Sequence, residues 1–164
     1  MTMHAGRLQA QRSFLAIAAV WLLLAVVHSA HAEVTPAASV PATHLIQPAD
    51  LASLLKDASS MKPIILQVGF RKLYDQAHIQ GSEYAGPANT AAGLQVLRDR
   101  VARLPKDASI VIYCGCCPWN RCPNIAAAFE ALQALGFTRV KVVYVADNFG
   151  TDWVDKGYPT AKLQ

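Results

Sequence analysis

The segment from Cys114 to Cys122 holds the residues best suited to chemistry. Its sequence, Cys-Gly-Cys-Cys-Pro-Trp-Asn-Arg-Cys, contains all 4 cysteines of the chain, which are Cys114, Cys116, Cys117 and Cys122, together with Arg121. A cysteine is nucleophilic, and binds soft metals, in its thiolate form, and the pKa of a free thiol is about 8.5. Chemistry at neutral pH therefore needs a neighbouring group that favours the anion. The fixed positive charge of Arg121 is one such group.

A strand is predicted before this segment and a helix after it. Ile110 to Tyr113 is a run of branched and aromatic residues typical of a buried strand. Residues 125–135 are predicted to form a helix that Gly136 ends, and the amino end of this helix would direct unpaired N–H groups at the cysteines. Further helices are predicted over 48–56 and 94–104, and further strands over 64–68 and 140–145. This alternation indicates an α/β fold with a central parallel sheet and helices on both faces.

Several uses of four neighbouring cysteines remain open. In an oxidising compartment Cys117 and Cys122 could close a small disulfide across the loop, and the cysteines could also serve only to staple it. Thiolates also suit Cu(I) or Zn(II), so copper is a possible ligand. The segment lacks the separated Cys-x-x-Cys pairs of common zinc modules, and without a Cys-x-x-Cys-His sequence it does not predict covalent haem.

The first 32 residues have the three parts of a secretory signal. Arg7 and Arg12 precede an apolar stretch of 14 residues, and Ala30-His-Ala32 offers the small residues that a signal peptidase reads. A transmembrane helix needs about 18 apolar residues or more, so this stretch is short for an anchor. We expect a signal peptide over 1–32, a flexible lead-in over 33–43, one domain over 44–164, no membrane span after cleavage, and a periplasmic location.

The charge of the mature chain points to no polyanionic partner. Without Arg7 and Arg12 it carries 13 basic and 11 acidic residues, and the basic ones are scattered singly. Binding to nucleic acid or to a membrane surface requires clustered positive charge. We therefore expect neither partner. The 132 residues that remain after cleavage are enough for a hydrophobic core without disulfides or metal, which leaves the cysteines free for chemistry.

The order of several short motifs resembles the rhodanese-like family of sulfurtransferases. The strand that ends in Cys114, the arginine Arg121 and the Ala-rich helix before Gly136-Phe137 are similar to the surroundings of that family's active site. Upstream and downstream motifs match in the same order, over roughly residues 44 to 160; they are Tyr74, His78-Ile79, Gly81-Ser82, Trp153, Gly157 and Pro159. The resemblance implies the rhodanese-like fold, with a central parallel sheet of about five strands. It also implies a persulfide-forming cysteine, with no cofactor required. It gives no catalytic role to His78, which we expect to be structural.

The chain departs from the family pattern at three places. Gln67-Val68-Gly69 stands where the family carries Asp-Val-Arg, and Asn148-Phe149 replaces a Gly-Gly pair and is expected to reshape one wall of the site. The family loop has four residues between cysteine and arginine, whereas six separate Cys114 from Arg121 and four separate Cys116 from it. Because a strand anchors Cys114 at the carboxyl edge of the sheet, where ligands bind in open α/β folds, we expect Cys114 to be the nucleophile and Cys116 its rival.

The resemblance predicts a thiosulfate-type sulfurtransferase or a persulfide carrier. Its partners would be a small sulfur-containing anion or a thiol acceptor, and Arg121 would bind the anion. Cys116 and Cys117, on the rim, would be placed to attack a persulfide and release sulfide, which makes a protein redox partner possible. The alternative is a thiol-redox or copper-binding accessory protein that uses the same cysteines, Cys122 included, without turning over thiosulfate.

The N-terminal segment gives a direct prediction about the mature protein. Signal peptidase cleavage after Ala32 would make Glu33 the first residue. Intact-mass analysis of the protein from its native cells, with sequencing of its N-terminal peptide, measures this. Recovery of Met1 or of residues 14–27 in the mature product would contradict it.

Overall fold

The computed structural model describes residues 39–163, so the signal segment predicted over 1–32 lies outside the described residues. Val40 is 6% exposed and packs in the core, and Ala42–His44 forms a short 3-10 turn, η2. The packed chain thus begins before His44, and the lead-in expected over 33–43 is wrong at its C-terminal end. Among residues 39–163, no helix has the length and apolar character needed to cross a membrane.

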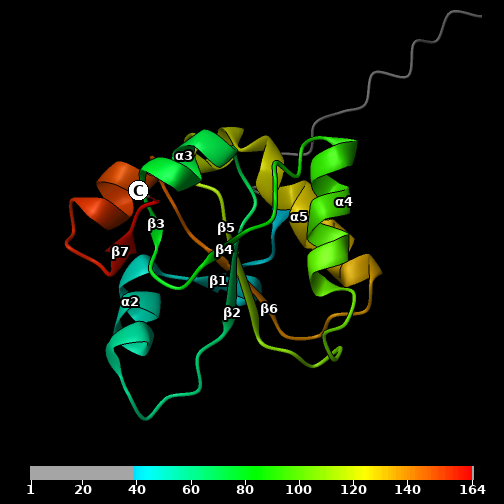
Figure 1. Cartoon of the computed structure of the whole chain (residues 1–164), viewed down its shortest axis with the longest axis horizontal. Coiled ribbons are helices and arrows are strands. Elements are labelled where there is room, and N and C mark those ends of the chain that lie inside the picture. The colour runs from blue at the N-terminus through cyan, green and yellow to red at the C-terminus, as the bar shows by residue number, and fades with distance from the viewer. Residues whose placement is uncertain (1–38, 164) are drawn as a thin grey trace, which may run out of the picture. The chain divides into compact units, whose positions relative to one another are not determined.

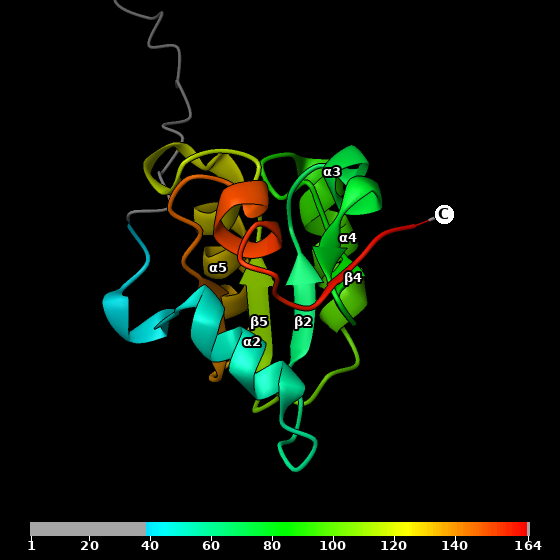
Figure 2. The same cartoon turned by 90° about the vertical axis from the view of Figure 1, so that its left-hand side faces the viewer.

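Five short parallel strands form the central sheet, in the order β1-β6-β5-β2-β4. This confirms the predicted parallel sheet. In the register of the central pair, Gln67 of β2 lies beside Tyr113 of β5, so the segments that follow both strands leave the sheet side by side. Figure 2 shows the arrows of β5 and β2 pointing to the same edge. The strands are β1 (Leu45–Ile46), β2 (Ile64–Gln67), β4 (Glu83–Tyr84), β5 (Ile110–Tyr113) and β6 (Val140–Val143).

Helices cover both faces of this sheet, as predicted (Figure 1). α4 (Ala91–Val101) and α5 (Pro123–Ala134) pack on one face through Leu97, Ile125 and Leu132. α2 (Pro48–Lys56) and the π-helical turn η4 (Gly150–Val154) pack on the other, through Leu51 and Trp153. The sheet therefore has two apolar faces, which explains why its central strand β5 is buried along its whole length.

Two of the three predicted helices begin earlier than predicted, and the residues at their amino ends explain this. α2 has the bounds predicted for it. α4 begins three residues earlier than expected, because the Thr90 hydroxyl accepts a hydrogen bond from the Gly93 amide at 3.0 Å and caps the helix. α5 begins two residues earlier, with Pro123 at its first position, where the missing N–H costs nothing.

A small antiparallel pair outside the main sheet was not predicted. β3 (His78–Ile79) pairs with β7 (Thr160–Ala161), next to the short helix α3 (Arg71–Gln76). His78 is buried, stacks on the Tyr74 ring at 4.0 Å between centroids, and contacts the Tyr74 carbonyl oxygen through Nδ1 at 2.8 Å. These contacts agree with the structural role expected for His78.

The Tyr113 hydroxyl joins β5 to this small pair. It accepts a hydrogen bond from the Ile79 amide and contacts the Ser82 hydroxyl, each at 3.0 Å, and burial is the main cause that raises its pKa. We predict that Tyr113→Phe lowers the free energy of unfolding by about 1–3 kcal/mol, because it leaves a buried amide unpaired. Denaturant unfolding measures the change. Tyr144→Phe is the control, and equal losses in both variants would contradict this role.

Candidate functional site

The loop Cys114–Cys122, called the Cys-rich loop below, leaves the sheet through a tight turn. Cys114 follows β5 directly, and Gly115 has φ +74°, a left-handed conformation that favours glycine. A Cβ at Gly115 would lie 2.6 Å from Phe149 Cβ, and the Phe149 amide donates a hydrogen bond to the Gly115 carbonyl at 3.1 Å. The predicted strand anchor of Cys114 is present, and Phe149 holds the start of the loop.

Three of the four thiols form a compact cluster. The sulfur atoms of Cys114, Cys116 and Cys122 all lie within 4.8 Å of one another. The Cys114 thiol donates to Cys116 Sγ at 3.2 Å, and Cys117 Sγ lies 3.1 Å from Cys116 Sγ on the other side. All four cysteines are free thiols in this structure, so the disulfide considered for Cys117 and Cys122 is not formed here.

Asn124 supplies the polar contact from α5. It is fully buried (0% exposed), and its Nδ2 donates to Cys114 Sγ at 3.5 Å and to Cys116 Sγ at 3.7 Å. Its Oδ1 accepts a hydrogen bond from the Asn89 amide at 3.0 Å, which fixes the amide group with its N–H bonds toward the sulfurs. The helix start thus contacts both sulfurs through a side chain in its first turn.

The cluster favours a negative charge on Cys116. Hydrogen bonds from Cys114 and Cys122, with smaller ones from Cys117 and Asn124, hold the pKa of Cys116 well below its usual range. The hydrogen bonds to Cys116 and Cys122 raise the pKa of Cys114, and burial adds to the shift. Burial and then Cys116 raise the pKa of Cys117. For Cys122, the hydrogen bond with Cys114 lowers the pKa, but Cys116 and burial outweigh it.

The end of β2 forms the other side of the site without a charged residue. Gln67 is buried, its Oε1 accepts from the Gly69 amide at 3.2 Å, and its Nε2 donates to the Cys114 carbonyl at 3.5 Å. A Cβ at Gly69 would lie 2.7 Å from Cys114 Sγ. Gly69 therefore gives the Cys114 sulfur its room.

A cavity of about 290 Å³ opens onto Cys114 and Cys116. Its walls come from the ends of β2 and β5, from α3 and from residues 148–154, which include Asn148 and Phe149. Cys114 is only 3% exposed, whereas Cys116 is half-buried, so Cys116 is the more accessible of the two sulfurs that line the cavity.

Two further residues of the Cys-rich loop, the predicted site residue Arg121 and its neighbour Trp119, do not line this cavity. Arg121 is exposed on the 3-10 turn η3 (Trp119–Arg121) and is not among the residues that line the cavity; its carbonyl oxygen accepts from Cys117 Sγ at 3.6 Å. Trp119 packs on Tyr144 with ring centroids 5.0 Å apart, and it does not line the cavity either. Anion binding by the Arg121 side chain stays a prediction.

Sequence reasoning missed Asn124, Gln67 and Gly69 as parts of the site. The signal that could have identified Asn124 is its position directly after Pro123. A proline there is typical of a helix start, where side chains of the first turn can reach the preceding loop. Gly69 was noted only as the loss of an arginine, and its closeness to Cys114 depends on the pairing of β2 with β5. The space that Gly69 leaves beside the Cys114 sulfur can be recognised only once the pairing of β2 with β5 is known.

Asn124 gives a test of the charge assignment. We predict that Asn124→Ala shifts the pH dependence of Cys116 alkylation by iodoacetamide upward by roughly 1 unit, because a donor to the thiolate is lost and its pKa rises. Peptide mapping at a series of pH values measures the rate at each cysteine. Asn120→Ala, in the same loop but exposed, is the matched control. An unshifted profile in Asn124→Ala, or faster alkylation of Cys114 than of Cys116 in the wild type, would contradict the assignment.

Comparison with known proteins identifies similar solved structures but no match by sequence. No protein-family model and no curated protein matches the sequence. The rhodanese-like domain of the Alr3790 protein from Anabaena is similar with a TM-score of 0.56 and 22% identity, over 73% of this chain and 80% of that chain. The BH2092 protein from Bacillus halodurans is similar with a TM-score of 0.56 and 22% identity, over 73% and 77%. EanB in complex with ergothioneine gives a TM-score of 0.51 and 18% identity, over 71% of this chain and 27% of that one.

These similarities are similarities of structure, at sequence identities of 22%, 22% and 18%. At these levels of identity they establish the fold. The domain described by residues 39–163 has the rhodanese-like fold.

Proposed function

We propose that this protein is a sulfurtransferase or persulfide carrier that holds one sulfane sulfur on Cys116. The observation that carries the proposal is the position of Cys116, which lines the cavity and lies within hydrogen-bond distance of Cys114, Cys117 and Asn124. This choice differs from the sequence-based expectation of Cys114. The reason is that Cys114 is almost fully buried and has a raised pKa, whereas attack needs an accessible thiolate.

The first half-reaction moves one sulfur atom onto the enzyme. The Cys116 thiolate attacks the outer sulfur of the donor, a new S–S bond forms, and the bond between that sulfur and the donor body breaks. The donor body leaves with the electron pair, as sulfite from thiosulfate or as a thiolate from an organic persulfide. In the second half-reaction a nucleophilic acceptor attacks the outer sulfur, and Cys116 leaves as a thiolate.

Cys114 gives the same site a second outcome. Its sulfur lies 3.2 Å from that of Cys116, so deprotonated Cys114 can attack the inner sulfur of a Cys116 persulfide. The new bond is a Cys114–Cys116 disulfide, and the outer sulfur leaves as hydrosulfide. Two electrons pass from the two thiols to the sulfane sulfur, and a dithiol reductant, such as a partner redox protein, must restore the thiols. This supports a thiol-redox role beside sulfur transfer.

Soft-metal binding is a second candidate function. Three thiol groups within 4.8 Å of one another, those of Cys114, Cys116 and Cys122, match the thiolate ligands that Cu(I) prefers. Copper uptake by reduced protein, measured against a chelator of known affinity, tests this candidate. Tight uptake of one Cu(I) without sulfur loading would replace the proposed function.

We place the reaction in the periplasm as part of this proposal. The secretory signal predicted over residues 1–32 supports export. In an oxidising compartment neighbouring thiols pair unless a reductant maintains them, so the proposed reaction there needs a dedicated reductant. Cell fractionation with detection of the protein decides the location.

Persulfide mapping tests the proposed function directly. We predict that reduced, metal-free protein treated with a large excess of thiosulfate gains one sulfur, about 32 Da, that peptide mapping places on Cys116. Cys116→Ser should abolish both this gain and cyanide-dependent thiocyanate formation. Cys117→Ser removes a sulfur that does not line the cavity but keeps a hydrogen-bond donor next to Cys116, so it is the matched control and should keep both.

Two outcomes would contradict this proposal. One is a sulfur mapped to Cys114 with activity retained in Cys116→Ser, which would restore the expectation from the strand anchor. The other is that neither thiosulfate nor an organic persulfide gives a sulfur gain or a Cys114–Cys116 disulfide, which would exclude sulfur transfer.

A further inference from the structure

Apart from the thiolate proposed for Cys116, no charged side chain lines the cavity at the cysteines. Besides the two cysteines, its polar lining residues are the amides Gln67, Gln76 and Asn148 and Tyr113, whose hydroxyl is hydrogen-bonded to Ile79 and Ser82. Its apolar lining residues include Leu73, Phe149 and Val154. The side chains of Leu73 and Val154 are also partly exposed. A sulfur donor that enters this cavity therefore meets apolar carbon and uncharged amides.

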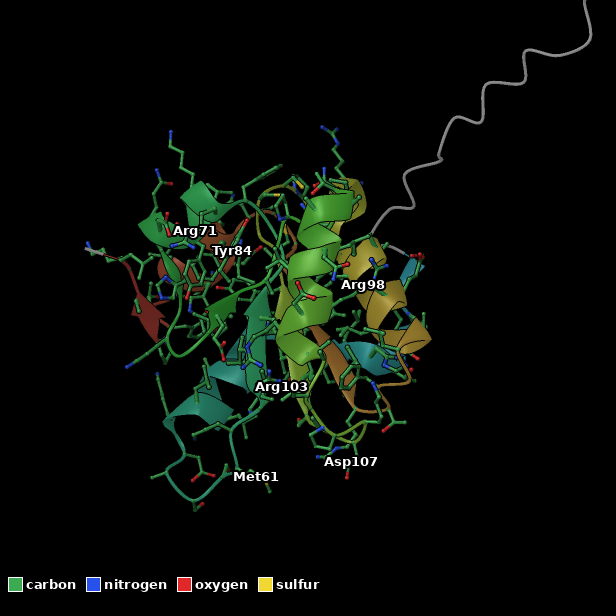
Figure 3. The ribbon with its side chains drawn as sticks, turned by 45° about the vertical axis from the view of Figure 1, so that its right-hand side comes forward. Met61, Arg71, Tyr84, Arg98, Arg103 and Asp107 are labelled. Atoms are coloured by element: carbon green, nitrogen blue, oxygen red, sulfur yellow. The ribbon has the colours of Figure 1, made fainter. Side chains whose placement is uncertain are left out.

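The cations next to these segments in the sequence, Arg71, Lys72 and Arg121, do not line the cavity. Arg71, on α3, is salt-bridged to Asp75 at 2.7 Å and lies over the Tyr84 ring at 5.2 Å from its centroid (Figure 3). Arg121 is exposed and does not line the cavity. At the end of β2, Gly69 has no room for a side chain because its Cβ would meet Cys114 Sγ.

The charges of the reacting groups then separate two classes of donor. Thiosulfate carries two negative charges, so its encounter with the Cys116 thiolate would gather three in an uncharged cavity. With an organic persulfide in its neutral form, the cavity holds only one negative charge. That charge moves from Cys116 to the leaving thiolate during the reaction. Like charges close together in a poorly solvated site repel strongly, and an apolar donor body gains from burial against apolar walls.

We infer that the physiological donor is an organic persulfide with an uncharged, apolar body, and that the site discriminates against thiosulfate and other anionic donors. This inference rests on the proposed function. Cys116 attacks the outer sulfur of R–S–SH, Cys116–S–SH forms, and R–S⁻ leaves and takes a proton from water. The cavity of about 290 Å³ is close to the lower end of the range of small-molecule pockets, roughly 300–1,000 Å³, which suits a small organic body.

Rates of sulfur loading with matched donors test the inference. Reduced full-length protein is mixed with benzyl persulfide, with 2-sulfonatoethyl persulfide or with thiosulfate, and the gain of sulfur on Cys116 is followed by rapid quenching and mass spectrometry. Each rate is divided by that of the same donor with a small free thiol, which corrects for intrinsic reactivity. We expect benzyl persulfide to be favoured over both anionic donors by at least about tenfold.

A charge introduced at the cavity provides the matched variant. Gln76→Lys places a cation on an exposed lining residue at the end of α3, and it should shift the ratio toward the anionic donors by roughly threefold to tenfold. Val96→Lys adds the same charge at an exposed position of α4, on the other face of the sheet, and should leave the ratio unchanged.

The outcomes separate this inference from the proposed function. Loading of Cys116 by every donor, with anionic donors equal to or faster than benzyl persulfide, would overturn the inference and leave sulfur transfer intact. An unchanged ratio in Gln76→Lys would also overturn it. If no donor loads Cys116, the proposed function itself fails.

Discussion

The close approach of three sulfur atoms is the constraint on which the site depends. Negative charges within 4.8 Å of one another repel strongly where water is scarce, so the cluster holds one thiolate far more readily than two. The Cys114 thiol donates to Cys116, and the Asn124 amide points at both sulfurs, so the single charge is stabilised on Cys116. The neighbouring thiols remain protonated because their hydrogen atoms stabilise that charge. The same contacts that favour a thiolate on Cys116 keep Cys114 protonated, which supports Cys116 as the proposed first nucleophile.

The fold brings these groups together from distant parts of the chain. The parallel pairing of β2 with β5 sets Gly69 against the Cys114 sulfur, and the turn at Gly115 fits against Phe149 from the segment after β6. Asn124 enters from the first turn of α5. At the end of β2 the site has Gly69, which leaves space, and the uncharged amide of Gln67. Its selectivity for a donor then depends on burial of the donor body instead of on ion pairing.

Much of the fold could be predicted from the sequence, because each long element has its own local pattern. The periodic leucines and Pro48 gave the bounds of α2, and the branched run gave β5. The pair of β3 with β7 was missed, since two-residue strands carry no period. The choice between Cys114 and Cys116 depends on burial and on contacts with Asn124, which no spacing along the chain reveals. For the same reason the sequence indicated a reactive loop but not the thiol that carries the charge.

Titration of the thiolates tests this account most directly, because it measures the charge itself without a donor. The ultraviolet absorbance of thiolates is recorded for reduced, metal-free protein over a range of pH, with Cys116→Ser and Cys117→Ser compared under the same conditions. The account predicts one thiolate for each chain that persists well below pH 7, is lost in Cys116→Ser and is retained in Cys117→Ser. Thiolate absorbance that appears only near the usual thiol pKa of about 8.5, or that persists at low pH in Cys116→Ser, would contradict it.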